Sequence, residues 1–202
     1  MAGVAPRERP RMSVALFRSF VEGRPDEEHW ELIDGAAMMM APPTFAHQRI
    51  ASNLERLLLE AVAIHAPTLT AYQRIGINLA PTVEDYDPEP DVVVIDSDAA
   101  EEPGERYAKR FHLVAEIVSS SDRIDVEQKR QVYKLHEACT LTVEQDRFEI
   151  RIDLRMDAGW TEQSLTRPDD LLILPDFGLR CRVADLYRGT ALLPRQPHRG
   201  TS

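Results

Sequence analysis

The stretch LVAEIVSSSDRIDVEQK, residues 113–129, decides the fold because it places a buried strand directly before a helix. Its first half is an apolar run typical of a strand that is covered on both faces, but Glu116 interrupts the run. A buried carboxylate is costly unless it is paired with a cation or bound to a metal ion. The serines at 119–121 end the strand, and the helix that begins at Ser121 or Asp122 carries Lys129. The stretch therefore predicts a strand–helix unit whose buried charge needs a partner.

The segments on either side predict the rest of an α/β fold, a mixed β-sheet flanked by helices with additional β-hairpins. Apolar residues at steps of three and four predict helices at 14–22, 44–65 and 121–138, and a further short helix is predicted near the C-terminus. Strands are predicted at 30–33, 36–40, 69–80, 92–95 and 112–118, followed by two antiparallel strands that meet near Gln145-Asp146. Residues 160–166 and 171–174 fit either another strand pair or a loop.

Three finer predictions concern one turn and two sets of side chains that are expected to face the core. The dipeptide Asp34-Gly35 predicts a tight hairpin turn. The run Met38–Met40 is expected to fill core space rather than to hold a cofactor. In the helix after residue 121, the apolar positions Ile124, Val132 and Leu135 are expected to point inward.

The length and composition favour one globular domain. The chain has 202 residues, 43% hydrophobic and 29% charged, and no run approaches the roughly 18 apolar residues of a membrane span. We expect a disordered leader at 1–12, a single domain at 13–188 and a flexible tail at 189–202. The charged N-terminus has no apolar signal core, so a cytoplasmic location is the default expectation. Cys139 and Cys181 are too few for a disulfide framework and are expected to be buried thiols.

The charge balance bears on possible partners. The 34 acidic and 24 basic residues give a net charge of −10, which disfavours a protein that coats nucleic acid by charge alone. A nuclease is still compatible with this charge, because a metal-binding cleft is itself acidic.

Two acidic residues stand on neighbouring apolar strands. Asp91 opens the strand at 92–95, and Glu116 interrupts its own strand. If the two strands pair, the carboxylates can approach each other, and both stay ionised only with a cation between them. Carboxylate oxygens in small number suit Mg²⁺ or Mn²⁺. The alternative is that Asp91 merely ends a turn and that Glu116 points to solvent from an edge strand.

Lys129 follows Glu116 on the early turns of the next helix, so its ammonium can reach back over the end of the strand. An ammonium group there can orient a metal-bound water or stabilise charge that develops on a phosphate. The alternative is a surface helix pair, since Asp125, Lys129 and Tyr133 recur at steps of four.

The ordered set of motifs resembles the Uma-two family of putative restriction endonucleases, within the PD-(D/E)xK nuclease superfamily. It comprises ELIDG, HQRI, PD followed by VVVI, and LVAEIVSSS followed by D-x-x-x-K-x-x-x-Y, and the likeness runs from about Ser13 to Tyr187. It implies a restriction-endonuclease-like core, hydrolysis of DNA phosphodiester bonds with Mg²⁺ or Mn²⁺, and a homodimer.

The resemblance also implies roles for individual residues. Asp91 and Glu116 correspond to the two metal-binding acids, with the backbone carbonyl of Ile117 as a further ligand. The superfamily's usual lysine position is Val118 here, and Lys129 matches the place to which the lysine has migrated in this family. Glu31 in ELIDG matches a recurrent acid that joins the site. His47 is expected to contact the start of its helix rather than to bind metal.

The sequence departs from the family pattern in one segment, and two alternative functions remain. The segment EACTLTVEQDR, residues 137–147, lacks the aromatic pair and Gly-Pro turn usual in the family, which affects sheet-edge and dimer details more than chemistry. The expected function is a magnesium-dependent endodeoxyribonuclease. A catalytically inactive nuclease-fold binding or regulatory module is the alternative. Chemistry on RNA or on a small phosphodiester is not separable from DNA cleavage by sequence.

Overall fold

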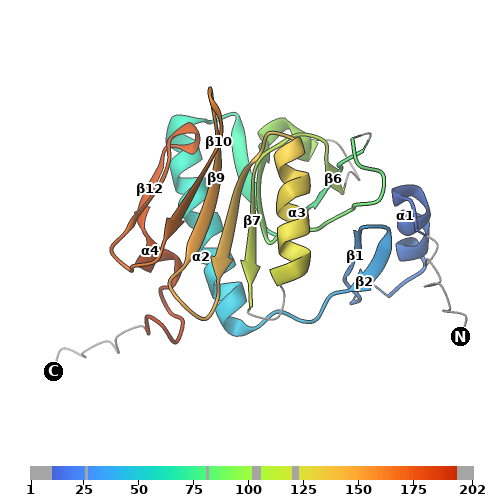
Figure 1. The fold of residues 1–202 in the computed structure, drawn as a ribbon, viewed down its shortest axis with the longest axis horizontal. Coiled ribbons are helices and arrows are strands. Elements are labelled where there is room, and N and C mark those ends of the chain that lie inside the picture. Colours follow the sequence, from blue (N-terminus) through green and yellow to red (C-terminus); the bar gives the residue numbers. More distant parts are fainter. Residues whose placement is uncertain (1–10, 26, 81, 102–105, 120–122, 195–202) are drawn as a thin grey trace, which may run out of the picture. The chain divides into compact units, whose positions relative to one another are not determined.

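The structure is a computed structural model that describes residues 11–194 except positions 26, 81, 102–105 and 120–122 (Figure 1). At 100–101 and 123–125 only the backbone is described. The chain divides into two compact units: residues up to Ala41 with Leu79–Pro88, and Pro42–Asn78 with Glu89 onward. The first ten residues of the predicted leader and residues 195–202 of the predicted tail lie outside the described residues.

The larger unit is built on a six-stranded sheet in the order β10-β9-β8-β7-β5-β3 (Figure 1). Its strands are β3 (Leu69–Tyr72), β5 (Val92–Asp96), β7 (Phe111–Val118), β8 (Cys139–Glu144), β9 (Ile150–Met156) and β10 (Gly159–Leu165). β7 and β8 are parallel, and the other neighbouring strands are antiparallel. The parallel pair needs a crossover, which α3 (Arg123–Leu135) supplies. The predicted mixed sheet flanked by helices is therefore confirmed.

The strand of residues 113–118 is part of β7, which lies in the sheet between β5 and β8. This interior position explains its apolar run. All of its residues except His112 are buried. Alternate side chains point to opposite faces of the sheet. Ala115 and Ile117 belong to the main hydrophobic core, whereas Glu116 lies on the opposite face, beneath α3.

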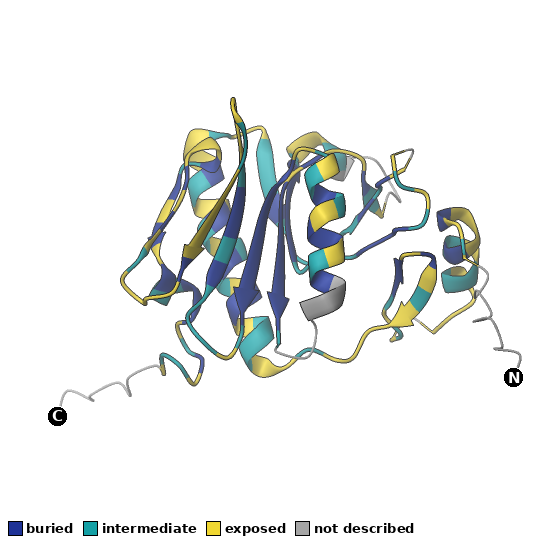
Figure 2. Cartoon of the chain, viewed as in Figure 1, coloured by how far each residue is buried: buried dark blue, intermediate teal, exposed yellow. Residues whose placement is uncertain are grey.

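The main core fills the space between the sheet and α2 (Phe45–His65), the longest helix. Thr44 caps this helix, because its hydroxyl accepts a hydrogen bond from the His47 amide at 3.1 Å. The helix residues that are buried against the sheet are Ile50, Ala51, Leu54, Leu58 and Val62. Ile64, near the end of the helical pattern, is exposed. Figure 2 shows the buried strands of the sheet in dark blue. Both cysteines are buried in the main core, as predicted.

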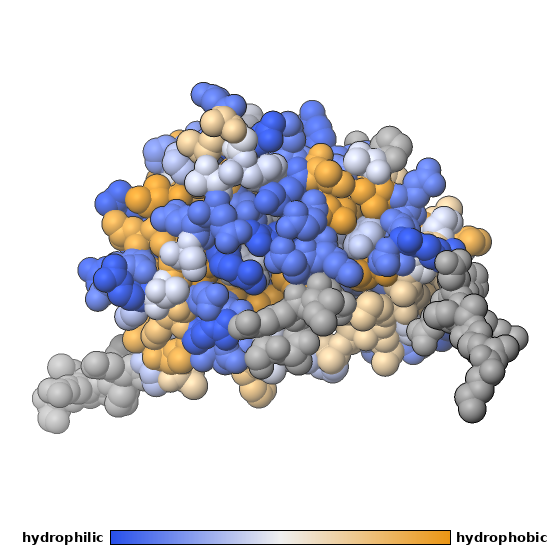
Figure 3. Space-filling view, in the orientation of Figure 1, coloured by the Kyte–Doolittle hydropathy of each residue, from blue (hydrophilic) through white to orange (hydrophobic). Residues whose placement is uncertain are grey.

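The opposite face of the sheet is covered by α3, which docks with polar side chains rather than with the predicted apolar ones. Leu135 is 63% exposed and Val132 is only half-buried, so the prediction that they point inward is wrong. The side chain of Ile124 lies outside the described residues. The helix residues buried against the sheet are Val126, Lys129, Arg130 and Tyr133. Accordingly, the surface over α3 and the neighbouring strands is largely hydrophilic in Figure 3.

Shorter elements complete the larger unit. The predicted strand at 69–80 is broken into β3 and β4 (Gly76–Ile77), because Arg74 has a left-handed backbone with φ +55°. β4 pairs with β6 (Tyr107–Ala108), after the single-turn helix η1 (Ser97–Glu101). Towards the C-terminus, β11 (Leu171–Leu174), η2 (Pro175–Phe177) and β12 (Leu179–Arg182) form a hairpin that leads into α4 (Val183–Leu186).

The smaller unit comprises α1 (Val14–Glu22) and the hairpin of β1 (Trp30–Ile33) and β2 (Ala36–Met39). Asp34 and Gly35 both have positive φ, +50° and +74°, as the predicted two-residue hairpin turn requires. Val14, Phe17 and Leu32 form its small core.

The methionines of this hairpin do not fill the core. Met38, Met39 and Met40 are all exposed, Met39 by 62%, so the prediction that they are core residues is wrong. The two strands form a sheet by themselves, and none of the three methionines is among the residues of the small core. Among the described residues, no helix of either unit is both long enough and apolar enough to span a membrane.

Candidate functional site

Asp91 lies directly before β5, where this strand meets β7. Its Oδ2 accepts a hydrogen bond of 2.7 Å from the backbone amide of Ile117, and its Oδ1 lies 2.8 Å from Nε2 of His47. Both oxygens of the carboxylate thus have a partner, which fixes its orientation at the end of the strand. The amide and carbonyl of one strand residue face the same neighbouring strand, so we expect the Ile117 carbonyl to face the Asp91 side.

His47 reaches Asp91 because the start of α2 is anchored beside the end of β8. Thr44, the N-cap, donates a hydrogen bond of 2.7 Å from its hydroxyl to Oε1 of Gln145. The backbone amide of Gln145 in turn donates to the carbonyl of Val118 at the end of β7. The His47 amide contacts the N-cap, as expected. Its ring contact with Asp91 was not predicted.

Glu116 is held by two residues of α3. The hydroxyl of Tyr133 donates a hydrogen bond of 2.6 Å to Oε1 of Glu116, and Nζ of Lys129 lies 3.5 Å from the same oxygen. The exposed fractions of Glu116, Lys129 and Tyr133 are 8%, 4% and 1%. The alternatives in which Glu116 faces solvent and Lys129 forms only a surface pair are therefore excluded.

The pairing of β5 with β7 brings Asp91 and Glu116 to the same end of the sheet. Val92 pairs with Ala115, so Asp91 and Glu116 are the next residues along the two antiparallel strands. Their described contacts differ: Asp91 contacts His47 and the Ile117 amide, whereas Glu116 contacts Tyr133 and Lys129. The two sets of contacts adjoin at Ile117, which directly follows Glu116.

Glu31 belongs to the smaller unit. It is buried on β1, where it pairs with Met38 of β2. Its role in the site therefore stays a prediction. Asp125 is described only by its backbone.

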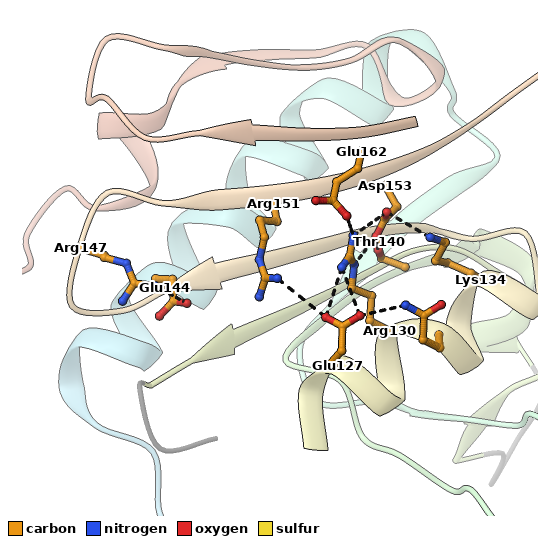
Figure 4. A network of polar contacts seen from close by, with 10 residues as sticks. Glu127, Arg130, Lys134, Thr140, Glu144, Arg147, Arg151, Asp153 and Glu162 are labelled. Atoms are coloured by element: carbon orange, nitrogen blue, oxygen red, sulfur yellow. Dashed lines mark hydrogen bonds and ion pairs between the residues drawn. The ribbon is translucent and has the colours of Figure 1, made fainter. Parts of the chain in front are cut away.

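A second polar network fixes α3 next to Lys129 (Figure 4). Arg130 forms hydrogen bonds through Nε and a terminal nitrogen with both oxygens of the buried Asp153 on β9, the latter at 2.7 Å. The same guanidinium contacts Glu162 on β10 and Glu127 on α3. Asp153 also accepts a hydrogen bond of 2.7 Å from Thr140. Lys129 therefore faces β7 while its neighbour Arg130 faces β9.

The network keeps the Asp153 carboxylate charged. Burial by itself raises the pKa of Asp153, but hydrogen bonds from Arg130 and Thr140 and the nearby Lys134 outweigh burial, so its pKa lies below the usual value. The hydrogen bonds to Asp153 likewise raise the pKa of Arg130, which keeps the guanidinium protonated.

The predicted donor set at the end of the sheet consists of oxygen atoms, the type of ligand that Mg²⁺ prefers. Among the residues that the structure describes, no three His, Cys, Asp or Glu side chains cluster closely enough to hold a metal ion by themselves. Mg²⁺ requires less, because it usually binds one or two carboxylates and keeps several waters. Asp91, Glu116 and the Ile117 carbonyl match this requirement.

Comparison with known proteins agrees with this reading of the sheet. The model of the Uma2 family, described as a putative restriction endonuclease, matches residues 16–184. The chain belongs to the Uma2 family. The resemblance noted in its sequence is thereby confirmed. No curated protein matches this Uma2 chain.

A solved structure shares the fold of this Uma2 protein. It is the crystal structure of a putative nuclease belonging to DUF820 from Anabaena variabilis ATCC 29413. The two structures superpose with a TM-score of 0.65 and 16% sequence identity, over 84% of this chain and 96% of that one. At this identity the similarity shows the restriction-endonuclease-like fold.

Proposed function

We propose that this Uma2 protein is a divalent-metal-dependent endonuclease that hydrolyses phosphodiester bonds in DNA. Asp91, Glu116 and the backbone carbonyl of Ile117 hold Mg²⁺ or Mn²⁺, and Lys129 acts on the attacking water. The observation that carries the proposal is the ion pair of 3.5 Å between the buried Glu116 and Lys129, one residue from the Ile117 amide that binds Asp91. A buried acid and lysine at one sheet end are costly for stability alone, which supports a functional role.

In the proposed reaction, Lys129 orients a water molecule beside Glu116. The water oxygen forms a bond to phosphorus, in line with the phosphorus–oxygen bond that breaks. The proton of the water passes to solvent, and the leaving oxygen takes up a proton from solvent. A divalent ion held by Asp91, Glu116 and the Ile117 carbonyl would stabilise the negative charge that develops on the phosphate. Asp91 keeps its orientation through the Ile117 amide and His47.

Plasmid cleavage in Mg²⁺ or Mn²⁺ tests the proposal. We expect Glu116→Ala to slow cleavage by on the order of 100-fold or more, because a metal ligand supports several kcal/mol of transition-state charge. EDTA should have a similar effect. The matched control is Glu60→Ala, which removes an exposed glutamate of α2 in the same unit. Cleavage that persists undiminished in Glu116→Ala or in EDTA would overturn the assignment.

The alternative function is a nuclease-fold binding or regulatory module without turnover. The net charge of −10 favours it, since a DNA-cleaving enzyme must also hold an anionic polymer. Calorimetry with Mn²⁺ separates the two functions. Absence of metal binding by the pure protein would favour the module.

We also propose that the protein forms a homodimer, as the family resemblance implies. The exposed Met39 and its neighbours on β2 support this, because an apolar strand edge is usually covered by another surface. Light scattering at micromolar concentration should give twice the chain mass of 22.9 kDa. A mass of one chain would count against the dimer.

A further inference from the structure

Tyr133 has no part in the reaction proposed above, yet its hydroxyl lies closer to Glu116 than the Lys129 ammonium does. It lies on α3 one turn after Lys129 and is buried. Its hydroxyl donates a hydrogen bond of 2.6 Å to Oε1 of Glu116, the same oxygen that lies 3.5 Å from the Lys129 ammonium. Two donors thus meet on one carboxylate oxygen.

This arrangement occupies Oε1. A carboxylate oxygen has about two lone-pair sites, one of which the Tyr133 hydroxyl fills, while the Lys129 ammonium forms an ion pair with the same oxygen. A hydrogen bond from a hydroxyl to an ionised carboxylate is short and strong, particularly where water is excluded. A metal ion that bound both oxygens of Glu116 would have to compete at Oε1 with the Tyr133 hydroxyl and approach the like charge of the Lys129 ammonium.

The position of Tyr133 is fixed by the helix that carries it. Arg130, which precedes Tyr133 by three residues on α3, is bound through two nitrogens to the buried Asp153 of β9. Lys134 adds an ion pair of 3.3 Å to the same carboxylate. Because α3 is anchored on both sides of Tyr133, the hydroxyl cannot move away from Glu116 without breaking buried contacts.

We propose that Tyr133 is a positioning residue that makes Glu116 a one-oxygen metal ligand, through Oε2, and that it thereby selects Mg²⁺ or Mn²⁺ against Ca²⁺. Ca²⁺ takes six to eight oxygens in flexible geometry and accepts both oxygens of a carboxylate, whereas Mg²⁺ demands a near-ideal octahedron. Holding Oε1 removes the two-oxygen mode that favours Ca²⁺. This inference rests on the proposed function, because it assumes that Glu116 binds the metal ion.

The test is calorimetry of the whole protein with Mn²⁺ and with Ca²⁺, in the absence of DNA, for the wild type and Tyr133→Phe. Loss of the hydroxyl should weaken Mn²⁺ binding about tenfold, as typically found when a partner of a ligand is removed. Ca²⁺ binding should be unchanged or tighter, so the ratio of the two dissociation constants shifts by about tenfold or more towards Ca²⁺. The matched control is Tyr187→Phe, since the buried Tyr187 donates its hydroxyl to the backbone carbonyl of Glu144 at 2.8 Å and not to Glu116. This control should keep the wild-type ratio.

The outcomes separate this inference from the proposed function. If Tyr133→Phe leaves both affinities unchanged, or changes them equally, the selectivity role is overturned. If Glu116→Gln binds Mn²⁺ as tightly as the wild type, the proposed metal site itself fails.

A second measurement covers the case in which Tyr133→Phe does not fold. Infrared spectra of the wild type with ¹³C-labelled glutamate, compared with Glu116→Gln, report the splitting of the Glu116 carboxylate bands in Mg²⁺. A splitting typical of one-oxygen binding supports the inference. One typical of two-oxygen binding overturns it.

Discussion

At the scale of single residues, the two donors on Glu116 differ in charge, and this difference separates their roles. Lys129 brings a positive charge into a buried place where a metal ion would also bring one. Its ammonium therefore lowers the affinity for the ion slightly, through like-charge repulsion. The presence of a lysine beside the proposed metal site is better explained by a role in the reaction than by a role in metal binding.

We expect Lys129→Met to slow plasmid cleavage on the order of 100-fold or more, because a group aimed at developing charge is lost. Its affinity for Mn²⁺ in calorimetry should not weaken, because the variant removes a repelling charge. Lys134→Met is the control: it changes the same residue type on the same helix, but Lys134 pairs with Asp153 and not with Glu116. Full activity of Lys129→Met would contradict the role of the migrated lysine.

The residues of the site could be predicted only in part. Glu116 was recognisable because a carboxylate interrupts an apolar strand, and Lys129 because it lies on the early turns of the next helix and matches the place of the family's migrated lysine. The contact of His47 with Asp91 joins residues that are 44 positions apart, and it depends on how α2 crosses the sheet. No local pattern carries that information. The sequence places Tyr133 four residues after Lys129 on the same helix, but it does not predict the hydrogen bond from Tyr133 to Glu116.

At the scale of elements, α3 shows why a hydrophobic pattern can misplace the buried face of a helix. Its apolar residues Val132 and Leu135 predicted one face, but the helix covers Glu116 on β7 and Asp153 on β9. Burying two carboxylates requires cations and hydroxyl groups opposite them. The helix therefore turns Lys129, Arg130 and Tyr133 to the sheet. By contrast, α2 covers an apolar face, and its buried residues Ile50, Leu54 and Leu58 follow the spacing of three and four residues that predicts the helix.

Arg130→Met should destabilise the protein by about 3 kcal/mol, because it leaves the buried Asp153 with a partly uncompensated charge. Urea unfolding measures this free energy. The double variant Arg130→Met/Asp153→Leu should recover much of the loss, since the buried charge is then gone. Arg56→Met, which breaks an exposed ion pair with Glu60 on α2, should cost only about 0.3–0.5 kcal/mol. An equal loss in both arginine variants would show that the network does not anchor α3.

The same network predicts an acid-sensitive part of the stability. The pKa of Asp153 is lower in the folded protein than its usual value, because its hydrogen bonds and the nearby cations outweigh the effect of burial. A carboxyl group with a lowered folded pKa contributes stability above its unfolded pKa, about 3.9, and the contribution is lost as the pH falls through the folded pKa. The difference in unfolding free energy between wild type and Asp153→Asn should therefore be full at pH 6 and shrink below about pH 4. A difference that stays constant with pH would contradict this account.

At the scale of the whole molecule, the family match spans residues 16–184 and so includes both compact units. The larger unit holds Asp91, Glu116 and Lys129, whereas Glu31 lies on β1 of the smaller one. Glu31 is buried although it is a carboxylate on a two-stranded hairpin, where a side chain could easily have faced water. Burial of a charge at such a position favours a function for it.

If Glu31 joins the metal site, as the resemblance implies, Glu31→Gln should weaken Mn²⁺ binding about tenfold, as loss of a ligand's partner does. Cleavage should slow with it. Glu22→Gln, at the exposed end of α1, is the control within the smaller unit. Wild-type Mn²⁺ affinity and cleavage in Glu31→Gln would mean that the site is complete within the larger unit. The buried acid of ELIDG would then serve the smaller unit alone.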